Sequence, residues 1–150
     1  MRTVIQRVKK ASVSIEGKVY ASINFGLLIL LGIETADNQE DIDYLCGKTA
    51  RLRIFDDEKG VMNLSVCDVN GSCLVVSQFT LHASTKKGNR PSYIHAAPPE
   101  IAVPLYKNFV SSLQKEMQSK VQTGVFGANM QIELINDGPV TIVMDSKNKE

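Results

Sequence analysis

The sequence predicts one α/β domain in which two helices cover a sheet and a second sheet lies behind it. The first observation is size, because 150 residues, 43% of them hydrophobic and 22% charged, are typical of a single soluble globular domain. The second is the count of elements, about eight strands and two helices. The third is their order, since the strands gather in two groups before and after the first helix. This order fits stacked sheets better than a doubly wound parallel sheet.

The first group of strands lies in the N-terminal part of the chain. Alternating apolar residues predict strands at 2–8, 11–15 and 19–23. Residues 27–33 are apolar on both faces, which is typical of a central strand buried on both sides. The longest apolar run, residues 26–33, is far shorter than the ~18 residues that a membrane-spanning helix needs. No membrane partner is therefore expected.

Apolar residues at helical spacing predict a first helix over about residues 39–53. Asp37 is the expected N-cap, and Glu40, three residues later, would complete a capping box. One face of this helix carries the residues that we expect to be buried, namely Ile42, Leu45, Cys46, Thr49 and Leu52.

The middle of the chain predicts a short strand at 54–55 and a convincing one at 73–79. Residues 82–98 then form an irregular stretch of seventeen residues. This length exceeds the ~12–15 residues usual for a plain connection, and it indicates a functional loop.

A second helix is predicted over about residues 99–119. Pro99 suits its first turn. Pro104 would lose one hydrogen bond and kink the helix, so we expect regular helix to begin only near Pro104. The expected buried stripe consists of Leu105, Phe109, Val110, Leu113 and Met117.

The C-terminal part predicts strands at 121–123, 130–135 and 140–144, followed by a polar tail at 146–150 that we expect to be frayed. Gly138–Pro139 separates the last two strands. Proline cannot donate a ladder hydrogen bond, and both residues are common in turns, so local chemistry favours a turn here. The alternative is a kink that presents its backbone to a ligand.

Charge and cysteine content limit the function classes. A formal net charge of +1 and a pI near 7.7 argue against a protein that coats nucleic acid by charge alone. Basic spots such as Lys9–Lys10 and Lys86–Arg90 still permit a small contact with an RNA end. Three cysteines without zinc-ligand spacing are typical of reduced thiols in a cytosol. The sequence opens on strand-like residues and not on a signal segment, so a cytoplasmic location is expected.

The clearest candidate site is SQFT, residues 77–80, where an apolar strand ends in polar residues. Ser77 and Thr80 supply hydroxyls, and Gln78 supplies an amide donor and acceptor. Two or three backbone N–H groups that converge here could hold a developing oxyanion.

No set of catalytic side chains stands out in the sequence. His82 and His95 are the only histidines and the candidates for a general base, although a lone loop histidine is more commonly solvated. Cys73 is a candidate nucleophile that fits the core equally well. The chain has no nucleophile elbow, phosphate-binding loop or dinucleotide motif. An enzyme built this way would work with backbone groups, or with a reactive group of its substrate.

Two motifs resemble the signatures of one family. SQFTL at residues 77–81 and NDGPVT at residues 136–141 are similar to the two signature motifs of D-aminoacyl-tRNA deacylases. The resemblance covers essentially residues 1–144, and the other similar segments are IQRV, ASVSIEGK, GLLILLGI, RLRIF, MNLSV, NRPSY and QTGVFGANM.

The resemblance implies a fold and an activity. The fold would be a three-layer β/β/α single domain over residues 1–150, with mixed sheets and two main helices, and it would form a homodimer. The partner would be the 3′ acceptor end of an aminoacyl-tRNA, whose ester to a D-amino acid is hydrolysed, as is the ester of glycine mischarged on tRNA. No metal or organic cofactor is implied, and no DNA is expected as a partner.

The resemblance also implies a chiral filter. Gly138–Pro139 would be a cis peptide that enters the active site of the partner subunit. Its carbonyl oxygens would face the α-carbon of the amino acid and leave room there for hydrogen but not for the side chain of an L-substrate. Arg7 would anchor this segment through its several donors.

The remaining site residues would hold the substrate. The catalytic segment Ser77, Gln78, Phe79 and Thr80 would bind the aminoacyl group, with Thr80 mainly positioning, while the terminal ribose 2′-OH assists attack by water. Phe126 and Met130 would line the pocket for the terminal adenosine, although by default such a pair is core packing.

Two other functions stay open at this point. One is a module that holds tRNA ends without hydrolysis. The other is a serine, threonine or cysteine hydrolase of small esters, which predicts labelling of Thr80, Ser77 or Cys73 by an acylating inhibitor. Release of D-tyrosine but not L-tyrosine from tyrosyl-tRNA would separate the deacylase from both.

Overall fold

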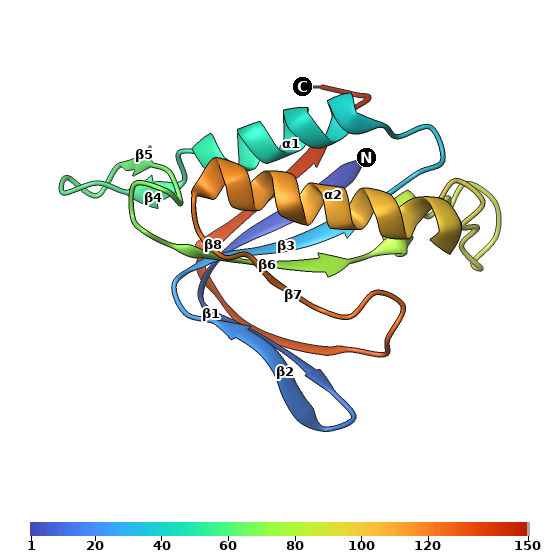
Figure 1. The fold of residues 1–150 in the computed structure, drawn as a ribbon, viewed down its shortest axis with the longest axis horizontal. Coiled ribbons are helices and arrows are strands. Elements are labelled where there is room, and N and C mark those ends of the chain that lie inside the picture. The colour runs from blue at the N-terminus through green and yellow to red at the C-terminus, as the bar shows by residue number, and fades with distance from the viewer. Residues whose placement is uncertain (150) are drawn as a thin grey trace.

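A computed structural model describes residues 1–149 of the chain. The strands are β1 (Arg2–Ile15), β2 (Lys18–Ile23), β3 (Gly26–Gly32), β4 (Phe55–Asp56), β5 (Met62–Leu64), β6 (Ser72–Ser77), β7 (Gln122–Thr123) and β8 (Gln131–Asp145). The helices are α1 (Gln39–Arg51), the short 3₁₀ helix η1 (Phe79–His82) and α2 (Pro99–Met117). Both α-helices lie on the same side of the sheet, as Figure 1 shows. The predicted α/β class with two main helices is thus confirmed.

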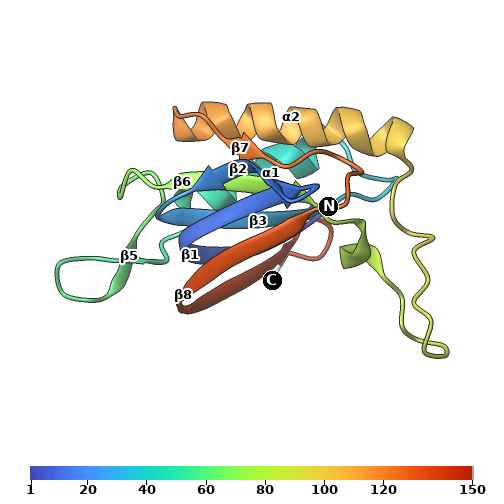
Figure 2. The ribbon, with the colours of Figure 1, turned by 90° about the horizontal axis from the view of Figure 1, so that it is seen from below.

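The strands that we assigned to two sheets belong to one mixed sheet of six strands, curved nearly into a barrel (Figures 1 and 2). The order is β2-β1-β3-β6-β7, and β8 also pairs with β1, on the edge that β2 and β3 leave unpaired. The only other sheet in the described residues is the ribbon β4-β5, of which β5 was not predicted. A single curved sheet still gives two cores, because its concave side encloses one of them and the helices cover the other on its opposite face.

Strand β1 explains why one sheet replaces two. Its first part pairs with β3 as far as Val8, its last part pairs with β2 from Ala11 onward, and β8 runs along both parts. The predicted strands at 2–8 and 11–15 are therefore one strand. Between these two parts, β1 continues in the same direction while its hydrogen-bonded partner changes from β3 to β2. A pattern of alternating residues does not reveal such a change of partner.

Strand β8 also replaces two predicted strands, 130–135 and 140–144. Both of its parts pair antiparallel with β1, and between the pairs made by Asn136 and Thr141 four residues of β8 stand opposite one residue of β1. Gly138–Pro139 lies in this bulge. The expected turn is wrong, because the chain continues in the same direction after the bulge and finds the same neighbour.

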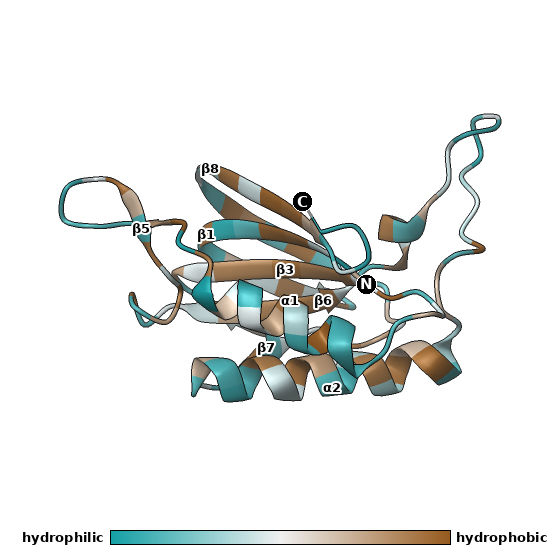
Figure 3. Cartoon of the chain, turned by 90° about the horizontal axis from the view of Figure 1, so that it is seen from above, coloured by the Kyte–Doolittle hydropathy of each residue, from teal (hydrophilic) through white to brown (hydrophobic). Residues whose placement is uncertain are grey.

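The two cores lie on opposite faces of the central strands. In β3, Leu27, Ile29 and Leu31 pack into the core beneath the helices, whereas Leu28 packs into the core on the concave side of the sheet. In β6, alternate residues divide in the same way. The prediction that residues 27–33 form a central strand is therefore confirmed, and Figure 3 shows the continuous hydrophobic colour of β3.

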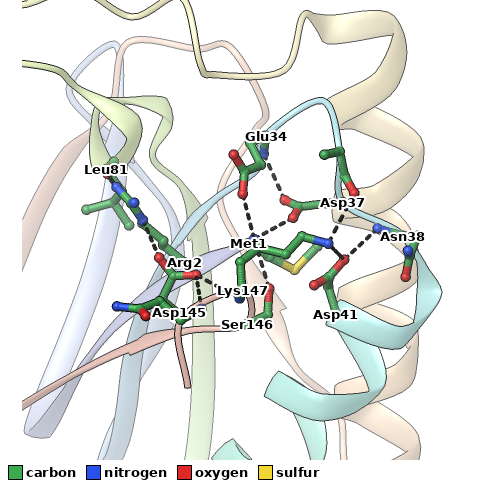
Figure 4. A network of polar contacts seen from close by, with 12 residues as sticks. Met1, Arg2, Glu34, Asp37, Asn38, Asp41, Leu81, Asp145, Ser146 and Lys147 are labelled. Atoms are coloured by element: carbon green, nitrogen blue, oxygen red, sulfur yellow. Dashed lines mark hydrogen bonds and ion pairs between the residues drawn. The ribbon is translucent and has the colours of Figure 1, made fainter. Parts of the chain in front are cut away.

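Helix α1 begins at Gln39, as predicted, but its N-cap is Asn38 and not Asp37. The side chain of Asn38 accepts a hydrogen bond from the N–H of Glu40, and the carboxylate of Asp41 accepts one from the N–H of Asn38, which completes a capping box. Asp37 does not cap the helix: its carboxylate accepts a hydrogen bond from the amino group of Met1, just before β1 (Figure 4). The sequence signal at 37 and 40 is thus displaced by one position.

The tail that we expected to be frayed contacts the start of α1 (Figure 4). Ser146 is buried and its hydroxyl accepts from the amino group of Met1, while Lys147 pairs with Asp41 at 2.7 Å. Burial would raise the pKa of Asp41, but the hydrogen bonds from Lys147, Ser146 and Asn38 outweigh it and hold the pKa below its ordinary value. Residue 150 lies outside the described residues.

Helix α2 begins at Pro99 and continues through Pro104, so the expected start near Pro104 is wrong. Pro104 removes one backbone donor, but its ring is exposed and the helix is held by burial of the opposite face. The buried residues of that face are Ala102, Tyr106, Phe109, Leu113 and Met117. Of the predicted stripe, Leu105 and Val110 are half-buried. Within the described residues, neither helix is long and apolar enough to cross a membrane.

Candidate active site

A cavity of about 310 Å³ opens at the end of the sheet where β3 and β6 finish. It lies under the start of α2 and beside the segment that leads from β7 to β8. The residues that line it come from four parts of the chain, and those with sequence-based expectations are Ser77, Gln78, Phe79, Phe126 and Met130. The fold therefore brings together two groups of predicted site residues that are about fifty positions apart.

The SQFT segment changes from strand to 3₁₀ helix inside this cavity. Ser77 is the last residue of β6, and the N–H of Gln78 donates to the carbonyl of Leu31 at 2.7 Å, which fixes the exit from the sheet. The turn begins at Phe79, where the first N–H groups of a helix have no partner within that helix. Phe79, where this turn begins, lines the cavity.

The side chain of Thr80 is occupied by a neighbour. Its Oγ1 accepts a hydrogen bond from Nε2 of Gln78 at 2.5 Å. Thr80 itself is not among the residues that line the cavity, whereas Gln78 is. This hydrogen bond joins two residues of the turn, and no side-chain base contacts the hydroxyl in the described residues.

Phe126 and Met130 reach the cavity from the loop after β7. Phe126 packs edge-on against Tyr106, with ring centroids 5.8 Å apart, and the hydroxyl of Tyr106 donates to the carbonyl of Val75 at 2.8 Å. Burial raises the pKa of Tyr106 and keeps its hydroxyl a donor. A Cβ on Gly124 would come within 2.5 Å of the sulfur of Met130, so a larger residue at 124 would require the Met130 side chain to move.

Tyr106 and Gly124 were not predicted as part of the site. No local pattern marks Tyr106 as a site residue, because in the sequence it is simply another apolar position of the predicted second helix. Gly124 stands in the segment QTGVFGANM, and its contact with Met130 depends on how two chain segments fold over each other. Both residues shape the cavity from behind its lining.

The histidines and the cysteines lie away from this cavity. His82 is buried at the end of η1, its Nε2 has no hydrogen-bond partner in the described residues, and burial lowers its pKa. His95 lines a different cavity together with His82. Cys73 is fully buried under the helices, and burial raises its pKa far above the ordinary value of a thiol. Within the described residues, neither a histidine nor a cysteine therefore lines the cavity.

A second feature, the bulge at Gly138–Pro139, is held by Arg7. The guanidinium is buried, its Nε donates to the carbonyl of Asp137 at 3.1 Å, and its Nη1 donates to the carbonyl of Ile54 at 2.6 Å. An ion pair with the carboxylate of Asp137 at 3.4 Å adds to this contact. The Gly138–Pro139 peptide bond is cis. Arg7 thus contacts the segment that the sequence assigned to it.

Asn136 closes the bulge from its other side. Its Oδ1 accepts from the N–H of Val140 at 3.1 Å, and its Nδ2 donates to the hydroxyl of Thr141 at the same distance. The bulge is therefore fixed at both ends by side chains from the NDGPVT motif and from β1. Sequence reasoning did not give Asn136 this role.

The bulge and the cavity lie at opposite ends of the sheet. Arg7 is the residue of β1 opposite the bulge; it pairs with Leu27 of β3, and Leu27 pairs with Cys73 of β6, whereas Ser77 is the last residue of β6. Four residues along the strand and three strand-to-strand steps therefore separate the bulge from the cavity. At ~3.3 Å per residue and ~4.8 Å per step, the separation is roughly 20 Å.

The site holds no set of side chains suited to a metal ion. Within residues 1–149, histidine, cysteine and carboxylate side chains do not gather in groups of three that could ligate one. The groups that the cavity offers are main-chain donors, one serine hydroxyl, the two side-chain amides of Gln78 and Asn129, and an apolar wall. Such a site can hold a planar base and a small polar group.

Fold and site together define a single-domain α/β protein with a barrel-like sheet and, at the end of β3 and β6, a pocket with an apolar wall and a few polar groups. The family model described as D-Tyr-tRNA(Tyr) deacylase matches residues 4–145, and the chain belongs to this family. The resemblance seen in the two motifs is confirmed.

Similar proteins extend over the whole chain. A D-aminoacyl-tRNA deacylase of Flavobacterium johnsoniae is 66% identical over 150 residues, with 100% of both chains covered. A solved structure described as the c-Myc DNA Unwinding Element Binding Protein has 40% identity and a TM-score of 0.92, covering 97% of this chain and 98% of that one. A structure described as a probable eukaryotic D-amino acid tRNA deacylase has a TM-score of 0.82 at 15% identity, covers 95% and 97%, and shows the shared fold.

Proposed function

We propose that this protein hydrolyses the ester between a D-amino acid and the terminal adenosine of tRNA, and likewise clears glycine that is mischarged on tRNA. Membership in the deacylase family supports this activity. The observation that carries it is the convergence of the SQFT segment with Phe126 and Met130 on one cavity. The reaction places the protein with aminoacyl-tRNA in the cytoplasm.

The cavity divides into two parts in this proposal. The terminal adenine lies against Phe126 and Met130, because apolar and aromatic side chains are suited to the face of a base. The aminoacyl group lies against Ser77 and Gln78, where the first N–H groups of η1 face the ester carbonyl. Thr80 positions the turn through Gln78.

The chemical step uses the substrate's own ribose. Water attacks the ester carbonyl with help from the 2′-OH, the backbone donors near Phe79 stabilise the oxyanion, and the bond to the 3′ oxygen breaks as that oxygen takes a proton. Free D-amino acid and tRNA are the products. The absence of a histidine or cysteine from the cavity lining in the described residues is consistent with this assignment. No cofactor takes part.

Stereochemical selection depends on a homodimer in this proposal. The bulge lies roughly 20 Å from the cavity of its own chain, a distance that strand spacing fixes. Gly138–Pro139 of one subunit therefore acts in the cavity of the other. Its carbonyl oxygens stand near the α-carbon and exclude an L side chain, while hydrogen fits, so that D-amino acids and glycine are accepted.

A direct comparison of tyrosyl-tRNAs tests the proposal. The protein is expected to release tyrosine from D-tyrosyl-tRNA and to leave L-tyrosyl-tRNA intact. Binding of both without release would instead identify a module that holds tRNA ends. Hydrolysis of small esters that lack RNA, together with acylation of Thr80 or Ser77, would identify a hydrolase with a side-chain nucleophile.

A further inference from the structure

A projecting arm stands beside the cavity, formed by residues 84–92. Two backbone hydrogen bonds close its base, from the N–H of Ser84 to the carbonyl of Ser92 at 2.8 Å and from the N–H of Ser92 to the carbonyl of Ser84 at 2.9 Å. Figures 2 and 3 show the arm extending away from the sheet and the helices. The proposed chemistry uses no residue of this arm.

The arm is strongly basic. Lys86, Lys87 and Arg90 are exposed, and residues 82–98 contain no aspartate or glutamate. None of these three cations forms an ion pair within the described part of the chain. With a formal net charge of only +1 for the whole chain, the arm concentrates positive charge in one place.

An exposed aromatic pair joins the arm to the cavity. Tyr93 follows the arm directly, and its ring packs edge-on against Phe79, with centroids 5.0 Å apart and planes at 73°. Phe79 lines the cavity and is 56% exposed, and Tyr93 is 39% exposed. The order in space from the cavity outward is therefore pocket, aromatic pair and cationic arm.

We propose that this surface binds the unpaired 3′ strand of tRNA just before the terminal adenosine, with a base stacked on Tyr93 and the phosphates beside Lys86, Lys87 and Arg90. This inference rests on the proposed function and adds a second contact region to the same substrate. Aromatic side chains interleaved with cations are how proteins hold single-stranded nucleic acid.

The dimensions of the arm agree with such a strand. From its base at Ser84 to its tip at Gly88 are four residues, or about 13 Å at ~3.3 Å each. Phosphates follow one another every ~3.4 Å of rise in a stacked strand, so the arm spans about four nucleotides.

Kinetics on two substrates test the arm. The triple variant Lys86→Ala, Lys87→Ala and Arg90→Ala is expected to raise KM for D-tyrosyl-tRNA with kcat unchanged. The slope of log KM against log salt concentration should fall by about 2, because three phosphate contacts are lost and each contributes ~0.7 to the slope on a single strand. On 3′-O-(D-tyrosyl)adenosine, which lacks the strand, the variant should equal the wild type.

A matched triple variant, Lys107→Ala, Lys115→Ala and Lys120→Ala, removes the same charge from exposed positions on and after α2. It should change neither KM nor the salt dependence.

Tyr93 is tested separately. Tyr93→Ala should raise KM for D-tyrosyl-tRNA about five- to 100-fold, the loss of one base stack, while Tyr93→Phe keeps the wild-type value. Sedimentation of each variant reports the oligomeric state.

The outcomes are distinct. If the wild type cleaves both substrates and the arm variants behave like the wild type on tRNA, the arm proposal is overturned and the deacylase function stands. If the arm or Tyr93 variants change the oligomeric state and lose activity on both substrates equally, the surface is a protein interface and the arm proposal is again overturned. If the wild type cleaves neither substrate, the proposed function is overturned, and the arm proposal, which rests on it, is overturned with it.

Discussion

At the scale of single residues, Arg7 connects segments that are distant in the sequence. It is buried in β1 and donates to carbonyls near residue 54 and at residue 137. A buried guanidinium must satisfy its donors, so the segment that supplies the acceptors is held in place. Gly138 adds a second constraint, with a φ of +126° that side-chain-bearing residues rarely adopt.

Gly138→Ala should weaken discrimination between D- and L-tyrosyl-tRNA. A Cβ there would come within 2.8 Å of Cγ2 of Val140 and 3.1 Å of Nη2 of Arg7, so the bulge must shift. Gly17→Ala is the matched control, because Gly17 also has a positive φ but no atom within 4 Å of the added Cβ. Both variants should lose about 1–3 kcal/mol of stability. Equal discrimination in the two variants would show that the bulge has no part in selection.

His82→Gln should reduce the acid sensitivity of the fold. Burial lowers the pKa of His82 below its ordinary value of 6.5, so the unfolded chain binds a proton more readily than the folded one. The stability that neutral His82 contributes is present above that value and is lost as the pH falls. The free energy of unfolding in urea should therefore differ less between about pH 7.5 and 5.5 in this variant than in the wild type. His95→Gln, at an exposed position, should match the wild type, and an unchanged pH difference in His82→Gln would contradict the assignment.

At the scale of elements, the sheet positions the site through strand length. β1 is long enough to pair with β3 along its first part and with β2 along its last part, and β8 pairs with both parts of β1. β3 and β6 are buried on both faces. The carboxyl ends of β3 and β6 then lie next to each other, which is where parallel strands commonly form ligand sites. The start of α2 and the loop after β7 close the remaining sides.

Helix α1 offers a test of the corrected cap. Asn38→Ala should lower the free energy of unfolding by about 1 kcal/mol, because it removes the acceptor for the first turn. Asn38→Asp keeps an acceptor and should remain near the wild type. Thermal or urea unfolding measures both, and activity on D-aminoacyl-tRNA should be unchanged because α1 does not line the cavity. A loss in Asn38→Asp as large as that in Asn38→Ala would exclude the cap as the cause.

At the scale of the whole molecule, bulge and cavity require two chains to meet in the proposed function. Two-fold symmetry would give each dimer two identical composite sites. Each site would take its cavity from one subunit and its bulge from the other.

Mixed dimers test this arrangement. Gln78→Ala impairs the cavity and Gly138→Ala impairs the bulge, so each homodimer should discriminate or react poorly. Coexpression should restore about one quarter of the wild-type sites, because half of the dimers are mixed and each has one site with both parts intact. D-tyrosyl-tRNA hydrolysis with D/L selectivity is the measurement. If all sites were formed within one chain, mixing would restore nothing.

The sequence by itself determined the central strand at residues 27–33, the two helices, the SQFT segment and the family, because periodic burial and short motifs are local properties of the chain. It did not determine that Gly138–Pro139 lies in a bulge, that β1 serves two parts of one sheet, or that Asn38 caps α1. These depend on which neighbour each segment finds. Tertiary structure alone placed Phe126 and Met130 beside Gln78 and set the bulge far from them, since strand pairing fixes distances that no local pattern contains.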